Sequence, residues 1–149
     1  TKLNAELVKS LFGNEAFGVI DNPEDPITSK KRILIGAGYE PGCSSDMDAV
    51  LLAENLHAHR IINVSNIDYV YTADPKKDKN AQPIKEMSWS DLLKIIGTTW
   101  KPRLNTPFDP IASKKAQELG LEVVILNGND LENLKNCLYN RSYKGTTIR

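Results

Sequence analysis

The chain has 149 residues, of which 40% are hydrophobic and 26% are charged, so its composition is that of a globular domain rather than a disordered chain. Lysine plus arginine and aspartate plus glutamate number 19 each, which excludes a global positive field that would attract nucleic acid or an anionic membrane. No apolar run approaches the roughly 20 residues of a membrane helix, and no signal-peptide pattern is present. Cys43 and Cys137 form no disulfide framework and fit a reducing compartment. We therefore expect a cytoplasmic protein with neither a nucleic acid nor a membrane partner.

The first half of the chain predicts a helix, a strand and a second helix. Residues 1–12 have the spacing of an amphipathic helix, with leucines four residues apart. Because this pattern already runs at Thr1 and no Met precedes it, we interpret the start as truncated. A polar, proline-containing loop leads to a buried strand over 32–36, and a glycine-rich loop then leads to a helix over 45–56.

The second half alternates strands and helices in the same way. The predicted strands are 60–65, 69–72, 121–126 and a terminal edge strand over 145–149, and the predicted helices are 88–96, 109–120 and 129–139. Asp109 is a suitable N-cap, Pro110 suits the first helical position, and Gly120 is a natural stop. Trp89 and Trp100 are expected to pack on the core. This order predicts an α/β fold of three layers (αβα) with a mainly parallel sheet.

The glycine-rich loop from Gly36 to Asp46 is the first candidate site. Glycines let backbone N–H groups approach a ligand closely, and the helix that follows offers the positive end of its dipole to an anion. Ser44 and Ser45 add hydroxyl donors. The loop matches neither a dinucleotide fingerprint, because its third glycine comes late, nor a P-loop, because it lacks a final Gly-Lys-Ser/Thr. A plain strand-to-helix connection with a serine N-cap is the alternative interpretation.

Two carboxylates, Asp46 and Asp48, open the helix after this loop. The helix dipole alone accounts for Asp48. Asp46 lies closer to the expected phosphate position, where a lone carboxylate would repel the ligand. It makes sense there if it holds a lysine or a magnesium ion.

The second candidate site is the segment 65–75, at the carboxyl end of the strand over 60–65. It combines amide, carboxylate and aromatic groups, as a purine or ribose pocket requires. A hairpin turn with aromatic edge residues is the alternative. His57 and His59 are two residues apart and do not predict a metal site.

These two segments resemble the UMP kinases of archaeal type in the amino acid kinase superfamily. The resemblance rests on the run from Pro41 to Glu54 (PGCSSDMDAVLLAE) and on the run from Ser65 to Asp78 (SNIDYVYTADPKKD). The segments 107–112, 126–128 and 145–146 follow in the family's order. The resemblance implies one partial amino acid kinase domain over 1–149. Residues 1–35 would be the remnant of an N-terminal lobe and linker, and 36–149 the nucleotide-binding C-terminal lobe, with the N-terminal part missing.

The resemblance also implies phosphoryl transfer from ATP to UMP with Mg²⁺, and a homo-oligomer when the protein has full length. Asp46 matches a carboxylate that orients catalytic lysines. No protein metal ligand is implied. The positions that match UMP-binding residues are Tyr39, Glu40, Pro41, Gly42, Cys43, Ser44 and Ser45, and those that match ATP-binding residues are Ser65, Asn66, Tyr71 and Asp74.

The chain departs from the family pattern in two places. Nothing matches the Lys-Leu-Gly-Gly-Ser-like strand and turn of the family's first third, and Tyr69 stands where the ATP signature has a glycine. We therefore expect this chain alone to bind nucleotides weakly and to catalyse poorly. The alternatives are a non-catalytic nucleotide-binding or molybdate/tungstate storage protein on the same fold, and a dinucleotide-binding oxidoreductase domain.

Overall fold

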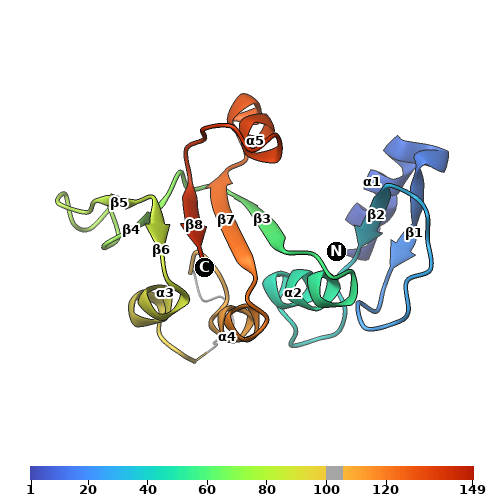
Figure 1. The fold of residues 1–149 in the computed structure, drawn as a ribbon, viewed down its shortest axis with the longest axis horizontal. Helices are drawn as coiled ribbons and strands as arrows, with labels where there is room; N and C mark the ends of the chain where they lie inside the picture. Colours follow the sequence, from blue (N-terminus) through green and yellow to red (C-terminus); the bar gives the residue numbers. More distant parts are fainter. Residues whose placement is uncertain (100–105) are drawn as a thin grey trace. The chain divides into compact units, whose positions relative to one another are not determined.

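The computed structural model describes residues 1–99 and 106–149, so the predicted packing of Trp100 lies outside the described residues. The chain divides into two compact units, Thr1–Ala58 and His59–Arg149. Each unit contains its own hydrogen-bonded strands, shown with their helices in Figure 1. The division into lobes at residues 35 and 36 stays a prediction.

The first unit carries the glycine-rich loop between a two-stranded parallel sheet and a helix. Its elements are α1 (Lys2–Phe12), a 3-10 turn (Gly13–Glu15), β1 (Ala16–Ile20), β2 (Ile33–Gly36) and α2 (Ser45–Asn55). The small core joins Ala5 of α1 to Ala16 and Ile35 of the two strands. The strand β1 was not predicted, because its five residues include a glycine and show no clear alternation.

The second unit is built on a four-stranded mixed sheet in the order β3-β7-β8-β6, and β4 and β5 form a separate two-stranded sheet. The strands of this unit are β3 (Arg60–Ser65), β4 (Val70–Tyr71), β5 (Pro83–Ile84), β6 (Glu86–Met87), β7 (Glu122–Asn127) and β8 (Thr146–Ile148). Its helices are α3 (Trp89–Ile96), α4 (Pro110–Glu118) and α5 (Leu131–Leu138). β3 pairs with β7 in parallel over all six residues, and β6 pairs with β8 in parallel. The predicted α/β class with a mainly parallel sheet is confirmed.

The terminal strand β8 corrects one prediction. We expected residues 145–149 to form an edge strand, but β8 lies between β7, with which it pairs antiparallel, and β6. The two-residue strand β6 covers what would otherwise be the edge. The strand β6 could not be predicted from the sequence, because two residues are too few to show the alternation of a strand. The predicted strand over 69–72 shortens to β4, which pairs antiparallel with β5.

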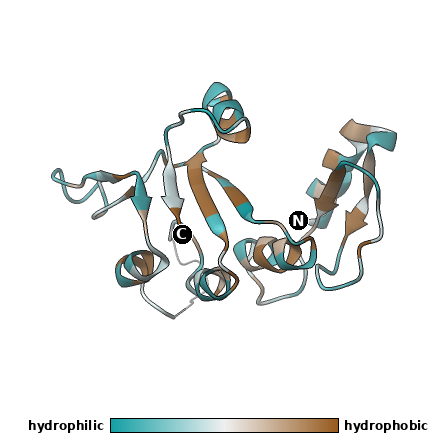
Figure 2. Cartoon of the chain, in the orientation of Figure 1, coloured by the Kyte–Doolittle hydropathy of each residue, from teal (hydrophilic) through white to brown (hydrophobic). Residues whose placement is uncertain are grey.

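The core of the second unit is centred on β7, where the hydrophobic colours of Figure 2 are concentrated. Val124 and Leu126 are fully buried and pack against Cys137 of α5. Val123 and Ile125 are equally inaccessible and point to the opposite face, because successive strand residues alternate. Both faces of β7 are therefore covered, as a strand in the middle of a layered α/β unit requires. Burial also raises the pKa of the Cys137 thiol.

The helices of the second unit begin at side-chain caps, of which Asp109 was predicted. Asp109 caps α4 by accepting hydrogen bonds from the N–H groups of Ile111 and Ala112, at 2.8 and 2.7 Å. Trp89, at the start of α3, is buried as predicted, and its indole N–H donates to the carbonyl oxygen of Leu121 at 3.1 Å. These contacts fix the N-terminal ends of both helices.

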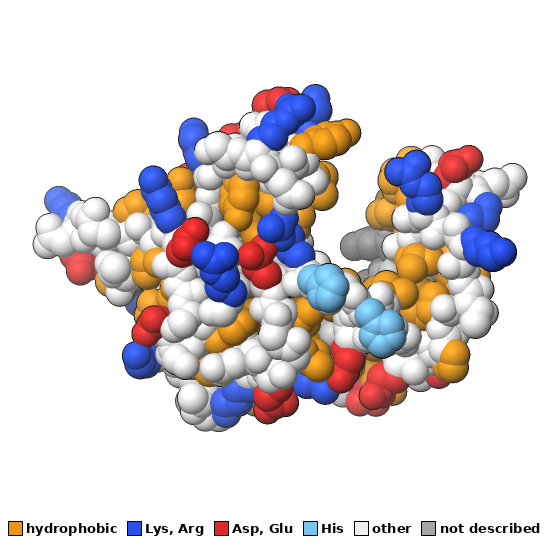
Figure 3. Space-filling view, in the orientation of Figure 1, with side chains coloured by type: hydrophobic (Ala, Val, Ile, Leu, Met, Phe, Trp, Pro, Cys, Tyr) orange, Lys and Arg blue, Asp and Glu red, His pale blue; other side chains and the backbone are white. Residues whose placement is uncertain are grey.

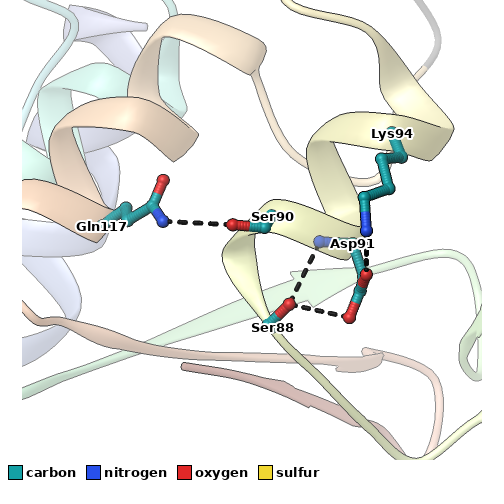
Figure 4. A network of polar contacts seen from close by, with 5 residues as sticks. All are labelled: Ser88, Ser90, Asp91, Lys94 and Gln117. Carbon is teal, nitrogen blue, oxygen red and sulfur yellow. Dashed lines mark hydrogen bonds and ion pairs between the residues drawn. The ribbon is translucent and has the colours of Figure 1, made fainter.

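A polar network stabilises the start of α3 (Figure 4). The Ser88 hydroxyl accepts from the Asp91 N–H at 3.1 Å and donates to the Asp91 carboxylate at 2.7 Å. The hydrogen bond from Lys94 to the other carboxylate oxygen, together with the Ser88 hydroxyl, lowers the pKa of Asp91. The Gln117 amide of α4 reaches Ser90 at 3.4 Å, so the network also links α4 to α3.

Candidate functional site: a turn before α2 and the strand ends of the second unit

The loop between β2 and α2 contains a type II turn formed by Glu40, Pro41, Gly42 and Cys43. The Cys43 N–H donates to the Glu40 carbonyl oxygen at 3.1 Å, and Gly42 has φ +97°. Proline suits the second position of such a turn, and the third position requires the positive φ that glycine adopts without strain. The Pro-Gly pair therefore sets the direction in which the chain enters α2.

Ser44 is the N-cap of α2. Its Oγ accepts the Met47 N–H at 3.2 Å, and its carbonyl oxygen accepts the Asp48 N–H at 2.9 Å. The predicted N-cap role of a serine is thus observed. The Ser44 hydroxyl keeps its own proton and can still donate it to an anion. Ser45 is the first residue of the helix, next to the positive end of the helix dipole.

Asp48 reaches back from α2 to the start of the loop. Its Oδ2 accepts the Tyr39 N–H at 3.3 Å, and its Oδ1 is buried with no hydrogen-bond partner among the residues that the structure describes. From the sequence, Asp48 was attributed to the helix dipole alone, and its hydrogen bond with Tyr39 was not predicted. The sequence signal for such a contact was a second carboxylate in the first turn of the helix.

A cavity of about 450 Å³ lies beside this loop, within the first unit. Five of the predicted UMP-binding residues line it, whereas Gly42, Ser44 and Asp46 lie outside the lining. The lining residues are Thr1, Lys2, Leu3, Gly38, Tyr39, Glu40, Pro41, Cys43, Ser45 and Asp48. Asp46 is partly buried in the first turn of α2. The cavity is thus lined by the hydroxyl-bearing Ser45 at the start of α2 and by the carboxylate-bearing residues Glu40 and Asp48.

The Tyr39 end of the loop is acidic. The Tyr39 hydroxyl donates to Glu24 at 3.5 Å, and Glu40 and Asp25 are also close enough to act on it. Partial desolvation and these carboxylates raise the pKa of Tyr39, so its hydroxyl stays protonated at neutral pH. This end suits hydrogen-bond donors rather than a phosphate.

Replacing Gly42 with alanine is expected to destabilise the first unit by about 1–2 kcal/mol, the cost of a side chain at positive φ. Equilibrium urea unfolding of the two proteins measures the difference. Gly18→Ala is the matched control, because a Cβ at Gly18 meets nothing within 4 Å and its φ is not positive. Equal unfolding midpoints for Gly42→Ala and Gly18→Ala would contradict the assigned turn.

The predicted ATP-binding residues belong to the second unit and occupy two places. Ser65 ends β3 and pairs with Asn127, the last residue of the parallel neighbour β7. The Ser65 carbonyl oxygen accepts the Gly128 N–H at 2.8 Å, and the Asn127 amide donates to Asp68 at 2.7 Å. Ligands of open α/β sheets bind at such carboxyl ends of parallel strands. Asn127 and Asp68 lie in segments that resemble the family, but they were not among the predicted ATP-binding residues.

Tyr71 and Asp74 lie on the β4–β5 hairpin. The rings of Tyr71 and Tyr69 meet edge to face with centroids 6.4 Å apart. Asp74 Oδ1 accepts the Lys76 N–H at 2.9 Å, and its other oxygen is 3.9 Å from the Lys77 ammonium. Asp74 therefore shapes the hairpin loop with one oxygen, as an Asx turn does. The hairpin alternative for this segment and its aromatic character are both observed.

Buried Thr146 of β8 connects this hairpin to the main sheet. Its Oγ1 accepts the Val70 N–H at 2.8 Å and donates to the Ile84 carbonyl oxygen at 2.5 Å. One hydroxyl thus holds both strands of the hairpin. The contact spans more than 60 residues of sequence, so no local pattern indicates it.

Both histidines are exposed, and both are visible on the face drawn in Figure 3. Within residues 1–99 and 106–149, no group of three or more His, Cys, Asp or Glu side chains is arranged to hold a metal ion. No helix in the described part of the chain is both long and apolar enough to cross a membrane.

The amino acid kinase family model matches residues 17–127. The chain is 31% identical to the uridylate kinase of Methanococcoides burtonii over 97% of this chain and 63% of that protein. It is 34% identical to the uridylate kinase of Methanobrevibacter smithii over 90% of this chain and 61% of that protein. For the uridylate kinase of Methanothrix thermoacetophila the identity is 31%, over 100% and 68%. The chain thus spans roughly two thirds of the length of these relatives.

Solved structures agree with the sequence relatives. The uridylate kinase of Archaeoglobus fulgidus superposes with a TM-score of 0.83 at 29% identity, over 100% of this chain and 68% of that one. The aspartate kinase of Synechocystis, at 16% identity, has a TM-score of 0.72 over 99% and 27%, which shows the shared fold alone.

The chain belongs to the amino acid kinase family. Within that family its relatives are uridylate kinases, and the predicted resemblance to them is confirmed.

Proposed function

We propose that this chain takes part in phosphoryl transfer from ATP to UMP, which gives UDP. The observation that carries the proposal is the Pro-Gly turn that leads into the serine-capped α2 beside a cavity of about 450 Å³. This loop occurs in a chain whose relatives are named uridylate kinases. Transfer between two nucleotides asks a protein mainly to position phosphates and to stabilise charge, and these residues are suited to both tasks.

The phosphate of UMP would bind at the Ser44–Ser45 end of the loop. The Ser44 hydroxyl retains its proton, and the helix dipole favours an anion at this position. The sugar hydroxyls would lie toward Tyr39 and Glu40, where carboxylates accept hydrogen bonds and repel phosphate. Pro41, Gly42 and Cys43 form the turn that connects the two ends.

ATP would bind in the second unit, at the carboxyl end of β3 and on the β4–β5 hairpin. Ser65 and Asn66 follow the strand directly and offer a hydroxyl and an amide. Tyr71 offers an aromatic face, and Asp74 has one oxygen committed to the loop and a second oxygen near Lys77. These groups fit the ribose and base of a nucleotide.

Asp46 would orient the lysines that stabilise the transferring phosphoryl group. Mg²⁺ would reach the site on the ATP phosphates, keeping several of its own waters and contacting at most one or two carboxylates. Mg²⁺ held in this way would neutralise charge on the phosphates. Asp46 lies in the first turn of α2, at the position that matches the family's lysine-orienting carboxylate.

UMP-dependent formation of ADP from ATP, with CMP and AMP as controls, tests the proposal on the 149-residue chain. We expect weak turnover that depends on UMP, and we expect Asp46→Asn to lower it about 100-fold, since small errors of positioning have effects of that size. Glu6→Gln is the control, because Glu6 is exposed, does not line the cavity, and pairs with Lys9 of the same helix at 3.4 Å.

The accompanying binding measurement is calorimetric titration with UMP and with ATP–Mg²⁺. Binding of both nucleotides without turnover would favour the non-catalytic alternative for this chain. Absence of UMP binding would contradict the proposed acceptor loop.

A further inference from the structure

Both the backbone and the side chain of Asp48 hydrogen-bond to the glycine-rich loop. Its backbone N–H begins the hydrogen-bond ladder of α2 by donating to the Ser44 carbonyl oxygen at 2.9 Å. Its side chain returns across nine residues to accept the Tyr39 N–H at 3.3 Å. The loop between them is therefore closed by a side-chain bridge as well as by the Glu40–Cys43 turn.

Helix stability does not explain this arrangement. A carboxylate in the first turn gains the benefit of the helix dipole while it points to solvent. The Oδ1 atom of Asp48 is instead buried and has no hydrogen-bond partner within the described ranges. A buried acceptor without a partner is unfavourable, so the helix dipole does not account for the position of this side chain, whose observed hydrogen bond is the one to the Tyr39 N–H.

The bridge also determines which donors of the loop are available. The Tyr39 N–H is occupied by Asp48, and the Cys43 N–H is occupied by Glu40. The N–H groups of Tyr39 and Cys43 are therefore engaged within the loop, which leaves Ser45 and the start of α2 as the donor-bearing end for a bound phosphate.

We infer that Asp48 is a positioning residue that holds the loop from Tyr39 to Ser45 in its binding conformation and sets the orientation of the bound nucleotide. The inference rests on the proposed function for the identity of that ligand, UMP. The bridge between Asp48 and Tyr39 is itself a property of the free chain and can be measured without a ligand.

Two measurements on Asp48→Ala and Asp48→Asn test the inference. Amide hydrogen exchange at Tyr39 is expected to rise about five- to tenfold in Asp48→Ala, the factor that corresponds to one lost hydrogen bond, and the dissociation constant for UMP to rise by a similar factor. Asp48→Asn keeps a carbonyl oxygen for the Tyr39 N–H. We expect it to stay within about twofold of the original chain in both measurements, which a role limited to charge would not produce.

Glu6→Ala is the matched control, because it removes an exposed carboxylate of the same unit outside the cavity lining and is expected to change neither quantity. If Asp48→Ala does not fold, Asp48→Glu replaces it, since it keeps the charge but displaces the oxygens by one methylene. We expect faster Tyr39 exchange in that variant as well.

The outcomes separate this inference from the proposed function. Unchanged Tyr39 exchange in Asp48→Ala, or faster exchange with an unchanged dissociation constant for UMP, would overturn the inference. If the original chain does not bind UMP but Tyr39 exchange responds as expected, the proposed function fails and the positioning of the loop by Asp48 stands.

Discussion

Replacing Leu126 with alanine is expected to lower the free energy of unfolding of the second unit by about 2–5 kcal/mol. Leu126 is fully buried in β7 and packs with Val124 and Cys137. Truncation removes apolar contacts and leaves a cavity that a strand covered on both faces cannot close. Urea unfolding followed by circular dichroism measures the change. Because whole domains are stable by only about 5–15 kcal/mol, the loss is a large share of the total.

Leu131→Ala is the control for this prediction. Leu131 lies on α5 and is 72% exposed, so its truncation should change stability by no more than about 0.5 kcal/mol. A loss below about 1 kcal/mol for Leu126→Ala would show that this face of β7 is not packed as the structure describes.

Replacing Gly145 with alanine is expected to destabilise the second unit by about 1–3 kcal/mol, the usual cost of forcing extra volume into a packed region. A Cβ at this position would lie 2.7 Å from the carbonyl oxygen of Ile125 and 3.2 Å from the Cβ of Leu126. The first of these atoms is backbone of β7, so relief requires a shift of one strand against the other. Urea unfolding measures the loss.

The same substitution has a second readout. A shift at Gly145 moves Thr146, whose hydroxyl holds the Val70 N–H at 2.8 Å, so amide exchange at Val70 is expected to rise. Gly18→Ala, which meets no atom within 4 Å, should instead be neutral or stabilising by up to about 1 kcal/mol. A neutral Gly145→Ala variant with unchanged exchange at Val70 would contradict the close approach of β7 and the end of the chain.

The position of Thr146 bears on the proposed function as well as on stability. The hairpin that carries Tyr71 and Asp74 hydrogen-bonds to the Thr146 hydroxyl of β8, which is 2.8 Å from the Val70 nitrogen and 2.5 Å from the Ile84 carbonyl oxygen. The proposed nucleotide-binding side chains of the hairpin thus depend on a residue that contributes no group to the site. Mutations near the end of the chain are therefore expected to weaken ATP binding.

Local patterns predicted much of this protein. The strand over residues 60–65 and the N-cap Asp109 are found where the sequence places them. A serine N-cap before α2 was anticipated and is found at Ser44, whereas the Pro41-Gly42 turn was not predicted although it too depends on neighbouring residue types. Each of these features depends on hydrogen bonds or dihedral preferences within one turn of chain, and such short-range physics is legible in a single sequence.

Other features depend on residues that are distant along the chain. The interior position of β8, the bond between Asn127 and Asp68 across 59 residues, and the double role of Thr146 arise only when the strands are assembled. Even the nearer contact of Asp48 with Tyr39 requires the turn at Gly42 to fold the loop back on the helix. From its residues alone the chain revealed its fold class, its family resemblance and its two candidate segments. Strand order and the partners of the site residues required the folded structure, because packing selects them from many locally equivalent possibilities.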